Sequence, residues 1–156
     1  MKTPMLPTDI FWTYLQPILE GIDGVASVQL SDAERMDRLS IASRSEDIYP
    51  AAFVMRPRYK GVDDNTGVYV HKFQTTLYFF VVAGMEEAEQ DTAYQTAERM
   101  ATDLMQRLFM DSKAYDCLFD LNSFSTEPVI YKTLDATYGY EVSFEVGLYI
   151  NHLLAH

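Results

Sequence analysis

Cysteine is almost missing from this chain, since Cys117 is the only one among 156 residues. A single cysteine cannot form a disulfide within the chain or build a cysteine-based metal cluster in one copy. This usage fits a reducing compartment such as the cytoplasm. Cys117 has no histidine near it in sequence and is followed by Leu118 and Phe119. We therefore expect a buried structural thiol rather than a nucleophile.

Long apolar runs are also missing. No stretch approaches the roughly 18 apolar residues from which a membrane-spanning helix is predicted. Residues 1–7 contain one charged side chain and two prolines but no apolar run, unlike a signal peptide. We therefore expect no membrane partner and a place in the cytoplasm.

Positive charge is scarce, and most of all in the second half. The net charge is −11, from 12 basic and 23 acidic residues. Residues 1–84 hold 8 basic and 10 acidic side chains, whereas residues 85–156 hold 4 and 13. Because this second half repels a polyanion, we expect no sequence-specific nucleic-acid binding. The acidic surplus has two open interpretations: general solubility, or a surface that meets a basic partner or lines a passage.

Motifs that dictate a chemistry are absent as well. No glycine-rich phosphate loop follows a strand, and no Gly-x-Ser-x-Gly turn occurs. The Asp63-Asp64-Asn65 segment lacks the glutamate spacing of a calcium loop and is expected to form a turn. His71 has no second ligand at metal-binding spacing, so we expect it on a strand surface. The sequence therefore predicts no catalytic residue, cofactor or metal, and a protein that is not an enzyme.

What is present indicates one globular domain over residues 1–156. Hydrophobic residues make up 48% and charged residues 22%, as is usual for a folded domain. Periodicity predicts a helix over 11–22 with an N-cap at Thr8 and Asp9, and a long helix over 85–111. Strands are predicted over 25–30, 51–60, 68–82, 126–133 and 139–151. We expect flexible ends at 1–7 and 152–156 and a mobile loop over 31–48.

This order of elements predicts the α+β class. We expect an antiparallel or mixed sheet of about four to five strands, with the long helix packed on one face and an N-terminal helix beside it.

A cationic stripe is the first interaction candidate. Arg56, Arg58 and Lys60 alternate along the strand predicted over 51–60, on the same side as Val54. Pro57 within this strand predicts a sheet edge. The alternative interpretation is a solvated strand face whose charges discourage aggregation.

The second candidate is the exposed face of the last strand, which carries Glu141, Glu145 and Tyr149. The two glutamates are separated by about 13 Å at the usual rise of a strand, too far to share a proton in catalysis. Opposite charges on separate edge surfaces can instead pair between identical subunits in a head-to-tail ring.

The order of the elements resembles that of the tail terminator and neck proteins of long-tailed bacteriophages. In that family an N-terminal helix precedes a β-hairpin, a long helix packs on the sheet, and a closing hairpin completes it. The matching stretches are 11–22, 51–82, 85–111 and 126–151. Residues 138–146, Tyr-Gly-Tyr-Glu-Val-Ser-Phe-Glu-Val, are similar in type to the family's last strand. The polar segment 31–45 stands where the family often has a flexible assembly segment.

This resemblance is topological and has no invariant motif, so it assigns no residue-level role. It implies a structural function: a homo-hexameric ring that caps the tail tube and receives the head connector. The implied partners are further copies of the chain, tail-tube proteins and head-connector proteins. The implied locations are the host cytoplasm and the virion tail. An acidic lumen would let DNA pass.

Two other functions stay open. One is a monomeric acidic adaptor that binds a single protein partner. The other is a small ligand-binding or enzyme domain with a pocket between the sheet and the long helix. Its site would draw on scattered residues such as His71, Tyr78 and Asp91. The mass in solution and the presence of a deep polar pocket distinguish these functions.

Overall fold

The computed structural model describes residues 6–32, 34–35, 48–132 and 136–154. Its helices are α1 (Pro7–Glu20), α4 (Glu87–Lys113), the short η1 (Leu121–Ser123) and α5 (Asn151–Leu154). Its strands are β1 (Ser27–Ser31), β2 (Ala51–Met55), β3 (Arg58–Asp63), β4 (Tyr69–Val82), β5 (Leu118–Phe119), β6 (Ser125–Lys132) and β7 (Ala136–Tyr149).

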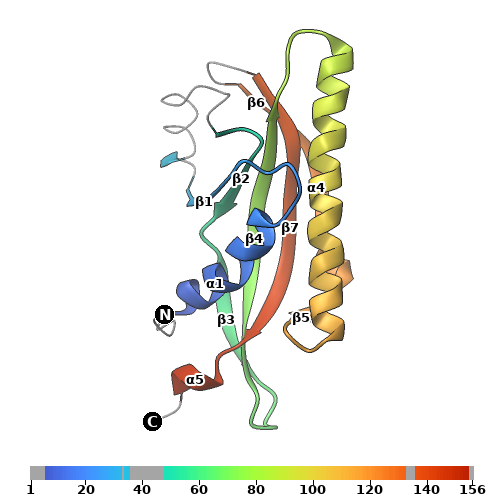
Figure 1. Cartoon of the computed structure of the whole chain (residues 1–156). Helices are drawn as coiled ribbons and strands as arrows, with labels where there is room; N and C mark the ends of the chain where they lie inside the picture. Colours follow the sequence, from blue (N-terminus) through green and yellow to red (C-terminus); the bar gives the residue numbers. More distant parts are fainter. Residues whose placement is uncertain (1–5, 33, 36–47, 133–135, 155–156) are drawn as a thin grey trace.

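These seven strands form one mixed sheet, which confirms the α+β class (Figure 1). The order is β1-β2-β4-β7-β5, with β3 also beside β4 and β6 also beside β7. The β1–β2 pair is parallel, and the other pairs described are antiparallel. The strand number exceeds the four to five expected because the 51–60 segment is divided and β5 adds a short strand.

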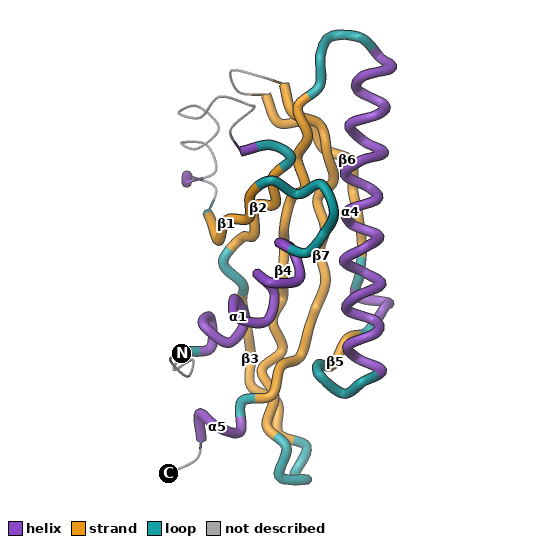
Figure 2. The backbone as a smooth tube through the Cα atoms, viewed as in Figure 1, coloured by secondary structure: helices purple, strands orange, loops and turns teal. Residues whose placement is uncertain are grey.

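Two long central strands and one long helix hold the fold together. β4 and β7 pair from Val70 opposite Tyr149 to Val82 opposite Thr137. Helix α4 lies along them (Figure 2) and buries six residues between them and itself. These are Ala93, Ala97, Met100, Ala101, Leu104 and Leu108. The sheet contributes Phe73, Leu77, Phe79, Val142, Phe144 and Val146. Burying each large side chain stabilises the fold by about 1.5–3 kcal/mol.

Helix α1 begins earlier than its predicted cap. Leu6 is the N-cap, and its backbone N–H donates to the Asp9 carboxylate at 3.3 Å. The N-cap predicted at Thr8 and Asp9 is therefore wrong. Pro7 occupies the first helical position, where its missing N–H costs nothing because that group has no partner within the helix. The helix continues through Pro17, and its Phe11 packs on Phe73 of the sheet at a ring distance of 5.3 Å.

The strand predicted over 51–60 is in fact two strands, β2 and β3, separated at Arg56 and Pro57. Phe53 pairs with Tyr78, and Arg58 pairs with Gln74. Phe53 and Arg58 are five positions apart, whereas their partners Tyr78 and Gln74 are only four positions apart on β4. One extra residue is therefore inserted between β2 and β3. Because side chains alternate between faces, the insertion moves Arg58 and Lys60 to the face opposite that of Val54. Pro57 has no N–H to continue the ladder.

The sheet consequently has two different faces. Helices α1 and α4 pack on one, because both contribute to the main core. We call the other the outer face. At one end it holds a small apolar cluster of Tyr49, Ala51, Phe53 and Phe80, and it is polar around Lys72, Gln74 and Glu145.

The remaining predicted segments differ at their ends. The mobile loop expected over 31–48 lies mostly outside the described residues, and so does the 133–135 connection between β6 and β7. Helix α5 occupies most of the end predicted as flexible, 152–156, and α1 already begins within 1–7. In the part of the chain that is described, no helix is long and apolar enough to cross a membrane.

Candidate functional site

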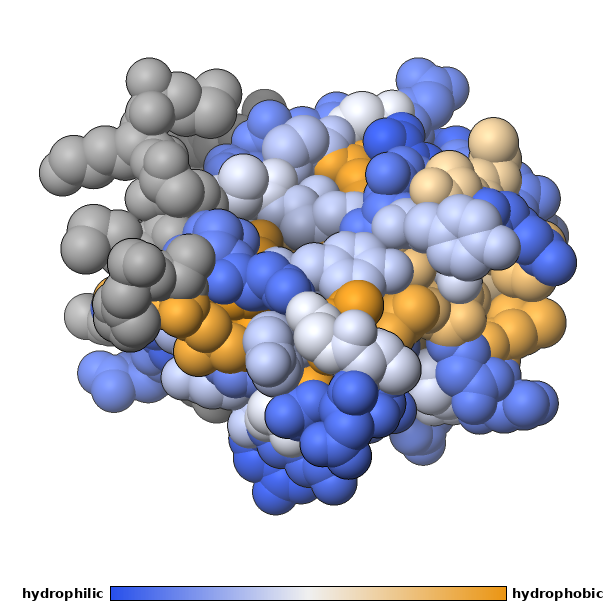
Figure 3. All heavy atoms as spheres, turned by 90° about the horizontal axis from the view of Figure 1, so that it is seen from below, coloured by the Kyte–Doolittle hydropathy of each residue, from blue (hydrophilic) through white to orange (hydrophobic). Residues whose placement is uncertain are grey.

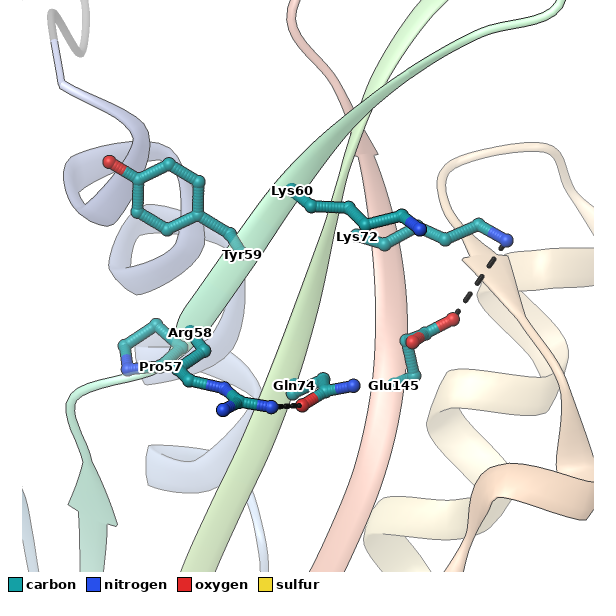
Figure 4. A pocket seen from close by; sticks show the side chains of 7 residues that line it. All are labelled: Pro57, Arg58, Tyr59, Lys60, Lys72, Gln74 and Glu145. Carbon is teal, nitrogen blue, oxygen red and sulfur yellow. Dashed lines mark hydrogen bonds and ion pairs between the residues drawn. The ribbon is translucent and has the colours of Figure 1, made fainter.

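An open hollow of about 520 Å³ lies on the outer face where β3, β4 and β7 run side by side (Figure 4). Its lining residues are Pro57, Arg58, Tyr59, Lys60, Lys72, Gln74 and Glu145. We call it the cationic hollow, because three of these side chains are cationic and one is a carboxylate. It therefore carries positive charge in a chain whose net charge is −11.

The strand registers place five of these side chains in two rows across the outer face. In one row Arg58 lies opposite Gln74, which lies opposite Glu145. In the other row Lys60 lies opposite Lys72. Residues directly opposite each other have Cβ atoms about 4.5–5.5 Å apart, and like charges in that position destabilise the sheet. The hollow thus concentrates cations at a cost to the isolated chain.

Internal contacts compensate only part of this charge. The Lys72 Nζ atom lies 3.8 Å from Glu145 Oε1. Arg58 Nη2 donates a hydrogen bond of 2.8 Å to the neutral amide oxygen of Gln74. In the described part of the chain, neither Arg58 nor Lys60 has a carboxylate within ion-pairing distance. Two cations are therefore available to a bound anion.

Glu145 also borders two smaller hollows on the same face. One, of about 370 Å³, extends along β4 and β7 past Thr76 and Ser143. The other, of about 230 Å³, extends toward Leu118 and Asp120. The three hollows thus share Glu145 in their linings.

The structure brings together three of the six residues predicted for self-association. Arg58, Lys60 and Glu145 all line the cationic hollow. The prediction that the cations and carboxylates occupy separate edge surfaces is wrong. Residue insertion between β2 and β3 turns the cations to the outer face, and Glu145 lies there on the central strand β7.

The other three predicted residues lie elsewhere. Arg56 is exposed between β2 and β3, and its backbone N–H donates to the Ser31 carbonyl at 3.1 Å. Glu141 accepts a hydrogen bond from Tyr78, and burial together with this bond raises the pKa of Tyr78 to about 12. Tyr149 stands at the far end of β7.

Sequence reasoning missed Lys72 and Gln74. Both alternate with the core residues of β4, which indicates that they point away from the core. Their place beside Arg58 and Lys60 depends on the β3–β4 register, which the extra residue near Pro57 sets.

The residues considered for an enzyme site do not converge. His71 and Tyr78 point to opposite faces of β4, because they are seven positions apart and side chains alternate between the faces. Asp91 is exposed on α4. The expected pocket between sheet and long helix is filled by fully buried side chains, including Leu77 and Leu104.

His71 is half-buried rather than on the surface. Its ring lies 5.0 Å from that of Tyr59, and burial lowers its pKa. Its buried Nδ1 has no hydrogen-bond partner among the described residues. The main core, with Leu153 of α5 packed against it, lies on the same face of the sheet as His71.

Two structural predictions are confirmed. Cys117 is fully buried; its sulfur lies 3.4 Å from the Tyr14 hydroxyl, and burial raises the pKa of the thiol. Asp63 and Asp64 stabilise the β3–β4 turn by accepting bonds from the backbone N–H groups of Asn65 and Thr66.

Within the described residues, no group of three or more His, Cys, Asp or Glu side chains is arranged to hold a metal ion.

Apolar side chains are exposed where α4 ends. Phe109 and Met110 at the end of the helix, Tyr115 in the following turn, Leu118 in β5 and Leu121 in η1 are between 41% and 79% exposed. In Figure 3, which views the molecule from below, apolar surface gathers on the side on which α4 ends in Figure 1. Groups of exposed apolar side chains mark contact surfaces in many soluble proteins.

No protein-family model matches the chain, and no curated protein matches it. The geometry of the cationic hollow is therefore the main guide to function.

Proposed function

We propose that this chain is a structural assembly protein whose copies bind one another in a ring. By its resemblance to phage tail terminators, the ring caps a tail tube and joins it to the head connector. Its partners are then tail-tube and head-connector proteins, and it is located in the host cytoplasm and the virion tail.

The observation that carries this proposal is the position of Lys60 directly opposite Lys72 in the cationic hollow. Two like charges in this position destabilise the isolated chain. An anionic partner removes that cost by neutralising both lysines. Because the chain has 23 acidic residues against 12 basic ones, further copies of the chain are a ready source of carboxylates.

The exposed apolar residues at the end of α4 support the same function. Oligomer contacts combine apolar area, which supplies most of the free energy, with charge pairs that set the orientation. This chain carries both kinds of surface: apolar side chains such as Met110 and Tyr115, and the cationic hollow.

Light scattering over a concentration series at low salt tests the proposal. We expect the mass to rise from that of one 17.9 kDa chain to one larger, fixed value, six times as great if the ring is a hexamer. A mass that stays at that of one chain up to millimolar concentration would contradict self-assembly and favour the monomeric adaptor.

A further inference from the structure

We infer that the cationic hollow of one copy binds the acidic start of α4, residues 85–91, of the next copy. This inference rests on the proposed self-assembly and names the two surfaces that meet. It replaces the pairing of the cationic stripe with Glu141 and Glu145 that the sequence alone favoured.

The carboxylates on β7 are already engaged within the chain. Glu145 lies beside the Lys72 ammonium group at 3.8 Å, and Glu141 accepts the hydrogen bond of Tyr78. Both also lie on the outer face with the cations that they were expected to meet in another copy. An unpaired carboxylate therefore binds the cations of a neighbouring subunit more favourably than Glu141 or Glu145 does.

Unpaired carboxylates gather instead at the start of α4. Glu86, Glu87, Glu89 and Asp91 are all exposed, and no cation of the described residues lies within ion-pairing distance of them. Farther along the same helix, Asp103 pairs with Arg99 and Asp111 pairs with Arg107. Charges at the start of α4 are thus unpaired, whereas these later carboxylates are paired.

Local helix stability explains part of this pattern. Carboxylates in the first turn interact favourably with the helix dipole. That effect does not explain Met85, which stands beside them and is 97% exposed. A methionine presented to water next to four carboxylates suits a contact with lysine and arginine side chains, whose aliphatic stems offer apolar surface beneath their charges.

The two surfaces cannot meet within one chain. The hollow lies on the outer face at Lys72 and Gln74, while α4 covers the other face and begins after the end of β4 at Val82. The eight residue steps from Gln74 to Val82 alone span about 26 Å of strand. A contact between different surfaces of two copies is head-to-tail, and such contacts close into rings when the rotation between copies permits it.

Charge reversal on each side tests the contact in the full-length protein. One variant carries Arg58→Glu and Lys60→Glu in the hollow, and the other carries Glu87→Lys and Glu89→Lys at the start of α4. We expect each variant alone to associate at least about tenfold more weakly than the wild type at low salt, because like charges then face each other. Light scattering measures the association.

Mixing the two variants gives the decisive result. In an alternating assembly, each reversed hollow meets a reversed helix start and each intact hollow meets an intact one. We therefore expect the equimolar mixture to regain the wild-type mass. Glu98→Lys serves as the control, because Glu98 is exposed on α4 away from both proposed contact surfaces, and it should leave association unchanged. Urea unfolding verifies that each variant is folded.

The outcomes separate this inference from the proposed function. If the wild type assembles and the two variants assemble equally well, the named contact is wrong while self-assembly stands. A mixture that fails to recover would also overturn the contact. If the wild type stays monomeric but its hollow binds a polyglutamate peptide, the partner is another acidic protein and both proposals fail.

Discussion

Lys60 and Lys72 lie directly opposite each other on the antiparallel strands β3 and β4, and both line the same hollow. Cross-strand pairs of like charge are unfavourable by a few tenths of a kcal/mol up to about 1 kcal/mol. The isolated chain is therefore less stable than it would be with a neutral residue at one of these two positions. That cost is explained if the two charges serve a bound partner.

Removing one of these charges should stabilise the single chain and weaken its assembly. We predict that Lys60→Gln raises the free energy of unfolding by up to about 1 kcal/mol at low salt, with the gain shrinking as salt screens the charges. Urea unfolding at a concentration below assembly measures this effect. The matched control, Lys113→Gln, removes an equal charge from the end of α4. A Lys60→Gln variant that is less stable than the wild type would contradict the argument.

A substitution at Glu145 distinguishes the two possible partners of the cations in a neighbouring subunit: the start of α4, or Glu145 itself. If the start of α4 binds the hollow, Glu145→Gln removes the one carboxylate that offsets Lys72 and makes the hollow more positive. We therefore predict several-fold tighter self-association at low salt, measured by sedimentation equilibrium. Weaker association would instead mean that Glu145 itself contacts a neighbouring subunit. The folded chain should change little, because pairs this exposed contribute less than about 1 kcal/mol.

Tyr14 joins α1 to α4. Its hydroxyl donates to the Asp111 carboxylate at 2.7 Å, and it also lies within hydrogen-bonding distance of the Cys117 sulfur. We predict that Tyr14→Phe lowers the free energy of unfolding by about 1.5–3 kcal/mol, because a part-buried carboxylate loses a donor. Tyr115→Phe is the control, since Tyr115 is 79% exposed. Urea unfolding measures both variants. Equal losses of unfolding free energy would show that the hydrogen bond from Tyr14 to Asp111 does not stabilise the fold.

Tyr78 should make the free energy of unfolding depend on pH in the alkaline range. Burial, followed by the hydrogen bond to Glu141, raises its pKa from 10.0 to about 12. The folded state therefore holds this proton more tightly than the unfolded state. Its contribution is present in full below pH 10 and is lost as the pH rises from 10 toward 12. We predict that Tyr78→Phe loses less stability than the wild type across this window. Parallel unfolding curves at each pH would contradict the assignment.

The long elements could be predicted because their patterns extend over many residues. Helix α4 has a buried stripe at helical spacing, and β7 alternates between core and polar positions along its length. The start of α1 also had a signal in the sequence, since Pro7 suits the first position of a helix. Thr8 and Asp9, which follow Pro7, are more typical N-cap residues than Leu6, and they led to the wrong prediction.

The site could not be predicted as it stands because it depends on strand register. Pro57 indicates that a strand is interrupted, but nothing in the sequence shows that one extra residue is inserted there. That residue decides which face Arg58 and Lys60 occupy. Lys72 joins them only through pairing between β3 and β4, so the unfavourable lysine pair is visible in three dimensions alone.

Electron microscopy of the full-length protein at low salt, above the concentration at which scattering detects assembly, tests the central claim most directly. Head-to-tail contacts between the cationic hollow and the start of α4 predict closed rings of one diameter. Those rings should be absent from the Arg58→Glu, Lys60→Glu variant and present again when it is mixed with the Glu87→Lys, Glu89→Lys variant. Fields of single monomer-sized particles for the wild type would contradict the account.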